Sequence, residues 1–253
     1  MSDSMQIVDR LLDIIEQLCQ ANAPVGPTYL AEKTGLHKST VYRLLSALHS
    51  RGYVEKNETD GTYFLGAKMI SLVGYYIDGL ELIAEARPYL ADLSAEFNLT
   101  AHLGLLDKTE VVYVEKLDAL PSKRLDSQIG YRVPAYCSSL GKCLLAALSA
   151  DELAEIFTTA DLIKYTVNTI STLAELKQHL RLVRSQGWAM DDQEFELGHR
   201  CIAAPVYDYR GEVIAAISVS GSLERLTDAV SPKIRAAVIA TAAKISKRLC
   251  YGG

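Results

Sequence analysis

A helix-turn-helix pattern followed by a hairpin begins the chain, and few folds accommodate it. Apolar residues at helical spacing predict helices over about Met5–Gln20, Thr28–Lys33 and Lys38–Arg51. A glycine-containing turn separates the second helix from the third, and Gly52 ends the third. A turn at Asn57–Gly61 between two short apolar runs predicts a β-hairpin. This order is typical of a winged helix-turn-helix, whose third helix enters the major groove of DNA while the hairpin touches the backbone.

The cations of this segment are concentrated on the third predicted helix. The first 66 residues carry six Lys or Arg and eight Asp or Glu, yet Lys33–Val54 contains no acidic residue. Positive charge placed there would neutralise DNA phosphates. Short hydroxyls at the start of the helix can cap it, or bond to phosphates and base edges. We therefore predict that the following residues contact DNA: Thr28, Lys38, Ser39, Thr40, Tyr42, Arg43 and Arg51.

Composition excludes several classes of protein. The 253 residues are 49% hydrophobic and 23% charged, which excludes a disordered chain and a disulfide-stapled miniprotein. A net charge of −5 excludes a uniformly basic nucleic-acid coat but allows a local basic patch. Five scattered cysteines without a Cys-x-x-Cys pair indicate free thiols in a reducing compartment. No secretory leader or run of 18 apolar residues occurs, so we expect a cytoplasmic protein without a membrane span.

From Thr100 onward the pattern changes to mixed strands and helices, and a helix over Ala67–Arg87 would connect this part to the first. Strand pairs separated by turns and helices favour an α+β fold over a doubly wound parallel sheet. We predict a DNA-binding domain over 1–66, a linker helix over 67–87 and an α/β domain over 88–253. The predicted strands are Ala101–Leu106, Val111–Lys116, Arg124–Ile129, Trp188–Phe195, Cys201–Tyr207 and Val213–Ser220; the predicted helices are Ser138–Leu148, Leu173–Gln186 and Pro232–Leu249.

Two separate stretches resemble the IclR family of bacterial transcriptional regulators. One is Gly35–Leu45, followed by Gly52-Tyr53-Val54. The other contains Gly187, Asp191, Glu194, Cys201-Ile202-Ala203 and Val206-Tyr207-Asp208. The resemblance covers nearly the whole chain. It implies a winged helix-turn-helix, a linker helix and a GAF-like α/β domain that binds a small metabolite. It also implies dimers or tetramers on near-palindromic operators of catabolic operons, as repressors or activators.

The C-terminal part has residues suited to a metabolite pocket. Backbone N–H groups at the start of the predicted helix Ser138–Leu148 would bind a carboxylate. The resemblance implies that the effector is an organic or sugar acid. Ser218 and Ser220 alternate on one strand and share a face, which is either inward or toward solvent. Asp191 either lines the pocket or only stabilises the turn near Gly198. The resemblance places effector contacts on Leu125, Val133, Ser139, Leu140, Asp191, Cys201, Ser218 and Ser220.

Three other functions compete with this prediction. Ser139 and Lys142 match the Ser-x-x-Lys motif of acyl-transfer enzymes, but the companion motifs are absent, so we expect no enzyme and no cofactor. A metal-responsive regulator is the alternative function, because potential zinc ligands gather within eleven residues. These potential zinc ligands are Asp191, Glu194, His199 and Cys201. As a third alternative, the basic helix could belong to an interaction module that binds no DNA.

Overall fold

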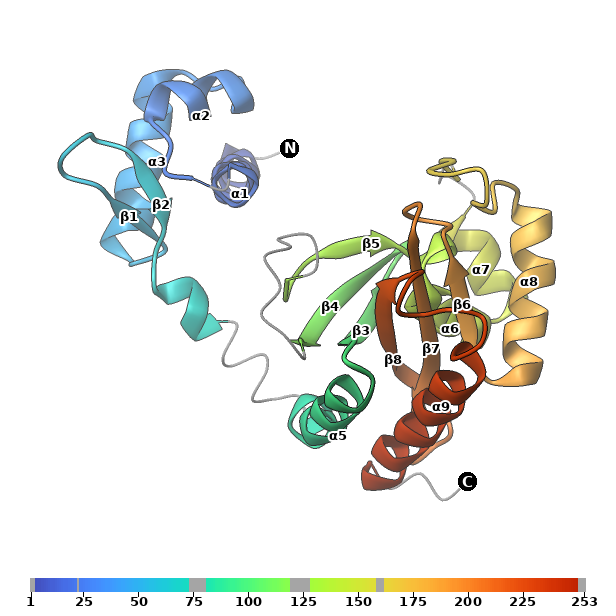
Figure 1. Ribbon diagram of the computed structural model, residues 1–253. Helices are drawn as coiled ribbons and strands as arrows, with labels where there is room; N and C mark the ends of the chain where they lie inside the picture. Colours follow the sequence, from blue (N-terminus) through green and yellow to red (C-terminus); the bar gives the residue numbers. More distant parts are fainter. Residues whose placement is uncertain (1–2, 22, 73–80, 119–127, 158–161, 250–253) are drawn as a thin grey trace. The chain divides into compact units, whose positions relative to one another are not determined.

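The computed structural model describes residues 3–21, 23–72, 81–118, 128–157 and 162–249 (Figure 1). The chain divides into two compact units, Met1–Leu80 and Glu81–Gly253. In the described residues, no helix has the length and apolar character needed to cross a membrane.

The N-terminal unit is a helix-turn-helix with a two-stranded wing. Its apolar residues meet in one core, where Ile14, Leu30 and Leu45 are completely buried. Gly35 and Gly52 take left-handed backbone conformations directly after α2 and near the end of α3, which is where the sequence predicts these helices to stop. The elements are α1 (Asp3–Gln20), α2 (Pro27–Thr34), α3 (Lys38–Ser50), β1 (Val54–Lys56) and β2 (Tyr63–Leu65).

An antiparallel sheet with helices on both faces forms the C-terminal unit (Figure 1). The strand order is β5-β4-β3-β8-β7-β6, so the fold is α+β, as predicted. The strands are β3 (Thr100–Asp107), β4 (Glu110–Leu117), β5 (Arg132–Pro134), β6 (Ala189–Asp192), β7 (His199–Tyr207) and β8 (Val213–Ser222). The helices are α5 (Glu81–Phe97), α6 (Ser139–Ala147), α7 (Ala150–Ile156), α8 (Leu173–Gln186) and α9 (Ser231–Arg248).

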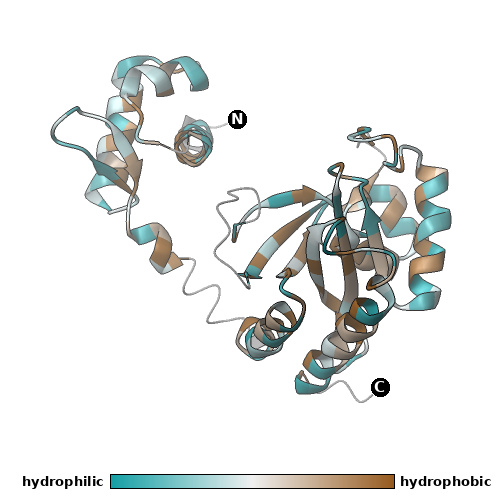
Figure 2. Ribbon diagram, in the orientation of Figure 1, coloured by the Kyte–Doolittle hydropathy of each residue, from teal (hydrophilic) through white to brown (hydrophobic). Residues whose placement is uncertain are grey.

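The two faces of this sheet have different partners. Helices α5 and α9 pack on one face, and α6 packs on the other with α7 and α8 beyond it. Ala216 of β8 belongs to the α6 cluster, so Ser218 and Ser220 also point toward α6, because successive strand residues alternate between faces. The helices alternate hydrophilic and hydrophobic residues along their length, as amphipathic helices do (Figure 2).

Several predicted elements differ from the structure. Most of the predicted strand Arg124–Ile129 lies outside the described residues, and Ile129 lies in a turn closed by a Tyr131 N–H bond to the Gln128 carbonyl. The predicted strand Trp188–Phe195 is shorter than expected, because the backbone turns at Gln193, where φ is +60°. Helix α7 was not predicted, although Ser149 and Glu152 form the capping box that begins it.

A helix boundary was expected at Pro88, and it is not there. Helix α5 runs through Pro88 without a break. Its buried stripe continues on both sides of the proline, with Ala86 and Leu90 completely buried. Packing of this stripe outweighs the backbone hydrogen bond that the proline removes. Residues 68–72 are helical, and the middle of the predicted linker helix, 73–80, lies outside the described residues.

Candidate DNA-binding surface and effector site

Helix α3 separates its residues into a buried face and an exposed face. Val41, Leu44, Leu45 and Leu48 pack into the core. The helical period places the opposite face in solvent, and there the Tyr42 side chain is 54% exposed. We define the outer face of α3 as Ser39, Tyr42, Arg43 and Ser46, all of which are exposed. Ser46 was not predicted, although it lies three residues after Arg43 on the same face.

Three predicted DNA-binding cations lie on α3 or directly after it and are available for phosphates. Lys38, Arg43 and Arg51 are exposed, and none forms an ion pair with another described residue. Thr28 is exposed in the first turn of α2, and Thr40 is half-buried beside the outer face. Six of the seven predicted residues are therefore exposed and accessible to a duplex, and Thr40 is half-buried.

The hydroxyls at the start of α3 do not cap the helix. Its N-cap is His37, which makes no side-chain capping bond. Ser39 is exposed beyond this cap, so its hydroxyl can bond to a ligand. Of the two roles that the sequence left open for these hydroxyls, capping is thus excluded.

The tip of the wing is acidic, whereas α3 carries exposed cations. Glu58 and Asp60 are exposed in the turn between β1 and β2. The one cation of the wing, Lys56, already pairs with Glu58 at 2.9 Å. Two hydrogen bonds from Thr62 lower the pKa of Asp60, so this carboxyl stays ionised. The wing tip therefore repels phosphates, and the expected contact between hairpin and DNA backbone has no support in its charge.

In the C-terminal unit, the start of α6 presents backbone donors beside buried side chains. The first N–H groups of a helix have no acceptor within the helix, and they favour anions. Ser138 satisfies one of them, because its hydroxyl accepts a bond from the Gly141 N–H at 3.2 Å. Ser139 and Leu140 follow, each 2% exposed.

Four of the predicted effector residues occupy neighbouring positions on three strands. Asp191 of β6 lies opposite Cys201 of β7, which lies opposite Ser220 of β8. Ser218 is the next residue of β8 on the same face and is 2% exposed, which excludes the solvent-facing alternative. Val133 packs in the same cluster as Leu140 of α6, and Leu125 lies outside the described residues.

A buried ion pair lies at the edge of this group. The Lys142 side chain is completely buried, and its Nζ contacts the Glu194 carboxylate and the Met190 carbonyl. These two oxygens engage the Lys142 amine, and no hydrogen bond joins it to Ser139 in the described residues. The Ser-x-x-Lys resemblance to acyl-transfer enzymes is therefore a consequence of helix spacing, with no catalytic pair.

Asp191 combines a structural role with unusual electrostatics. Its Oδ1 accepts a hydrogen bond from the Glu194 N–H at 2.7 Å, which fixes the turn after β6. Burial raises the pKa of Asp191 to about 7, and it also raises the pKa of Glu194. Asp191 therefore stabilises a turn, as one reading of the sequence proposed, while it also faces the start of α6.

The metal alternative finds no support in this region. Within the described ranges, no three His, Cys, Asp or Glu side chains are arranged to hold a metal ion. Asp191 is engaged with the turn, and His199 Nδ1 lies 3.7 Å from Glu196. Burial raises the pKa of Cys201 far above that of an ordinary thiol, which disfavours the thiolate that zinc needs.

A helix-turn-helix with an exposed basic face, joined in one chain to an α/β domain with a buried polar group, defines a DNA-binding transcriptional regulator with an effector-binding domain. Comparison with protein families agrees with this class. The IclR helix-turn-helix domain matches residues 7–58, and the C-terminal domain of the bacterial transcriptional regulator IclR matches residues 74–247. The chain belongs to the IclR family of bacterial transcriptional regulators.

Individual relatives resemble nearly the whole chain. The transcriptional regulator KdgR of Dickeya chrysanthemi is 35% identical over 98% of this chain and 81% of its own length. The transcriptional repressor IclR of Escherichia coli is 32% identical over 98% of this chain and 91% of its own. The crystal structure of the Thermotoga maritima IclR has a TM-score of 0.80 at 28% identity, covering 98% of this chain and all of that one. These relatives are transcriptional regulators, so this chain is a regulator and no enzyme.

Proposed function

We propose that this protein binds a near-palindromic operator of a catabolic operon, as its repressor or activator, under the control of a small organic or sugar acid. The exposed cations of the helix-turn-helix carry this proposal, because Lys38, Arg43 and Arg51 lack ion-pair partners in the described part of the chain. Thr28, Lys38, Ser39, Thr40, Tyr42, Arg43 and Arg51 are the proposed DNA contacts. Because DNA is the target, the protein acts in the cytoplasm.

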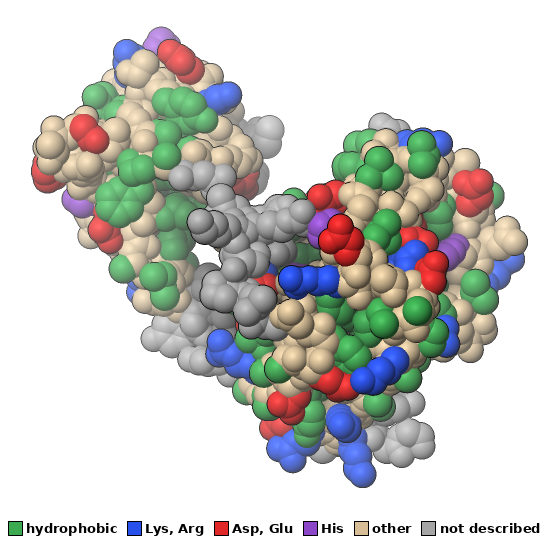
Figure 3. Space-filling model, in the orientation of Figure 1, with side chains coloured by type: hydrophobic (Ala, Val, Ile, Leu, Met, Phe, Trp, Pro, Cys, Tyr) green, Lys and Arg blue, Asp and Glu red, His purple; other side chains and the backbone are tan. Residues whose placement is uncertain are grey.

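Two copies of the chain would read two half-sites of the operator. An exposed apolar stripe on α1 supports a homodimer or a dimer of dimers, since Ile7, Val8 and Leu12 are 44%, 56% and 49% exposed. Figure 3 shows hydrophobic side chains, in green, on the visible face of the N-terminal unit. The occupant of the stripe would be the same stripe of a second copy, as a twofold interface requires.

The effector would bind on the sheet face that α6 covers, in the GAF-like domain. Its carboxylate would accept bonds from the N–H groups at the start of α6, and polar groups of the strands would hold the rest. The proposed contacts within the described residues are Val133, Ser139, Leu140, Asp191, Cys201, Ser218 and Ser220, and Leu125 is a further proposed contact. Such a ligand would shift the DNA-competent population by a coupling free energy of about 1–3 kcal/mol, which corresponds to roughly 5–150-fold.

Two measurements on the full chain test this proposal together. A footprint on the DNA beside its own gene should show a protected, near-palindromic site. A thermal-shift screen against organic and sugar acids should find a stabilising acid, and that acid should change the affinity for the site. An acid that raises the melting temperature without changing operator affinity would contradict the proposed control.

A further inference from the structure

His102 of β3 is a buried polar residue with an unsatisfied nitrogen. Its side chain is 2% exposed, and Nε2 has no hydrogen-bond partner in the described residues. Buried polar atoms in proteins are almost always hydrogen-bonded, so an orphaned ring nitrogen calls for an explanation such as a bound ligand. The sequence prediction of the effector site did not include this residue.

The strand register places His102 within the proposed effector site. Its Cα pairs with that of Ser218 on β8, so both side chains point to the face that α6 covers. Gly104 is the next residue of β3 on that face, and a Cβ added there would lie 3.2 Å from Leu140 Cδ1 of α6. His102 is therefore about 7 Å along the strand from the point where the first turn of α6 meets the sheet.

The ring lies beside an aromatic wall. The centroid of the Tyr113 ring is 4.7 Å from that of His102, and the Tyr131 ring follows at 6.1 Å from Tyr113. Ring surfaces of this kind pack against the apolar body of a ligand. The site thus places a ring nitrogen beside aromatic rings and beside Ser218, some distance from the start of α6.

The imidazole is neutral. Burial and the nearby Lys116 lower its pKa to about 4, although Asp118 opposes this effect. Each nitrogen of a neutral imidazole either donates or accepts one hydrogen bond, depending on the tautomer of the ring. A hydroxyl group can serve as the partner in either case, whereas an ionised carboxylate can only accept and so requires the tautomer that carries the proton on Nε2.

We propose that His102 determines effector specificity by binding a hydroxyl group of the acid through Nε2, while the start of α6 holds the carboxylate. This inference rests on the proposed function, because it assumes that an acid binds on this face of the sheet. It assigns the ligand to the class of hydroxy acids whose hydroxyl is separated from the carboxylate by several bonds.

The test compares acids that differ by one hydroxyl. Gluconate and 4-hydroxybenzoate serve as hydroxy acids, with 2-, 3- and 4-deoxygluconate and benzoate as the matched deoxy acids. Affinities for the full chain are measured by calorimetry for wild type, His102→Leu and His102→Gln. In wild type the preferred hydroxy acid should bind about 5–10-fold more tightly than its deoxy partner, as one buried hydrogen bond implies. His102→Leu should reduce this ratio to about one, and His102→Gln should restore part of it.

The stability of the unliganded protein provides a second readout. If Nε2 is unsatisfied without ligand, His102→Leu should keep or raise the melting temperature, whereas a structural role predicts a decrease.

The matched control is His179→Phe, because His179 lies on α8 and is partly buried. This variant should leave the hydroxyl preference unchanged. Retention of the preference in both His102 variants would overturn the inference while leaving the proposed function intact. Binding of none of these or other acids by wild type would instead contradict the proposed function, and the inference with it.

Discussion

Lys142 and Glu194 form an ion pair inside the C-terminal unit, with side chains that are 0% and 9% exposed. The pair connects the first turn of α6 to the turn after β6, where Asp191 lies. The same contact holds two sides of the proposed effector site in place, because Ser139 belongs to that helix turn.

Lys142→Met should destabilise the protein by about 3–5 kcal/mol, since it leaves the Glu194 carboxylate buried without a cation. Chemical denaturation of the full chain measures this change. The double variant Lys142→Met/Glu194→Leu removes both charges and should recover most of the loss. A single variant as stable as wild type would show that the pair is not buried in solution.

Asp191 should make stability depend on pH in an unusual direction. Its pKa is about 7 in the folded protein against 3.8 as the ordinary value, so the folded state binds the proton more tightly. The contribution to the free energy of unfolding is present below pH 3.8 and is lost as the pH rises through about 7. Asp191→Asn keeps an acceptor for the Glu194 N–H and cannot ionise. The free energy of unfolding of the Asp191→Asn variant, relative to that of wild type, should therefore rise between about pH 4 and pH 7. A difference between the two proteins that does not change with pH would contradict the raised pKa of Asp191.

Lys38→Ala and Arg43→Ala should each weaken binding to the operator. Each loss of a phosphate contact should also reduce the slope of log affinity against log salt by about 1. Fluorescence anisotropy at several salt concentrations measures both effects. Arg181→Ala removes an exposed cation from α8 in the other unit and is the control, which should leave the slope unchanged.

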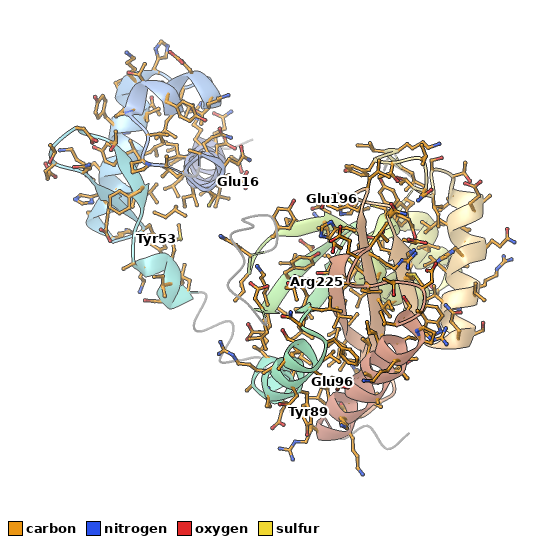
Figure 4. All side chains as sticks on the ribbon, viewed as in Figure 1. Glu16, Tyr53, Tyr89, Glu96, Glu196 and Arg225 are labelled. Carbon is orange, nitrogen blue, oxygen red and sulfur yellow. The ribbon has the colours of Figure 1, made fainter. Side chains whose placement is uncertain are left out.

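Removal of the negative charge from the wing tip should increase DNA affinity. Glu58→Gln with Asp60→Asn should strengthen binding to any duplex by about threefold, because two carboxylates no longer repel phosphates. The matched control is Asp92→Asn with Glu96→Gln, which changes the total charge equally on the exposed side of α5; Glu96 is labelled in Figure 4. Equal increases in both double variants would show that total charge, and not the wing, is responsible.

The sequence was most informative where periodic patterns decide the structure. The stripe Val41, Leu44, Leu45 and Leu48 determines which face of α3 is buried, and therefore that Tyr42 is exposed. Alternation along β8 likewise predicted that Ser218 and Ser220 share a face, but it could not say which one. That choice depends on the packing of α6, which tertiary contacts determine.

Contacts between distant residues could not be predicted. Nothing local to Lys142 indicates that Glu194 is its partner, and Asp191 acquires its raised pKa only when the sheet buries it. His102 was not among the predicted effector residues, because an unsatisfied nitrogen is a property of the surrounding structure. Pro88 shows the reverse case, in which packing of α5 overrides a strong local signal.

The most direct test of the central claim measures operator affinity with and without acid in the same titration. Wild type should bind the footprinted site tightly, and the stabilising acid should change this affinity at least fivefold, in the range expected for coupling between two sites. Tyr42→Ala/Arg43→Ala should lose operator binding yet keep the thermal response to the acid. Full operator binding by this double variant, or the same affinity with and without acid, would contradict the account.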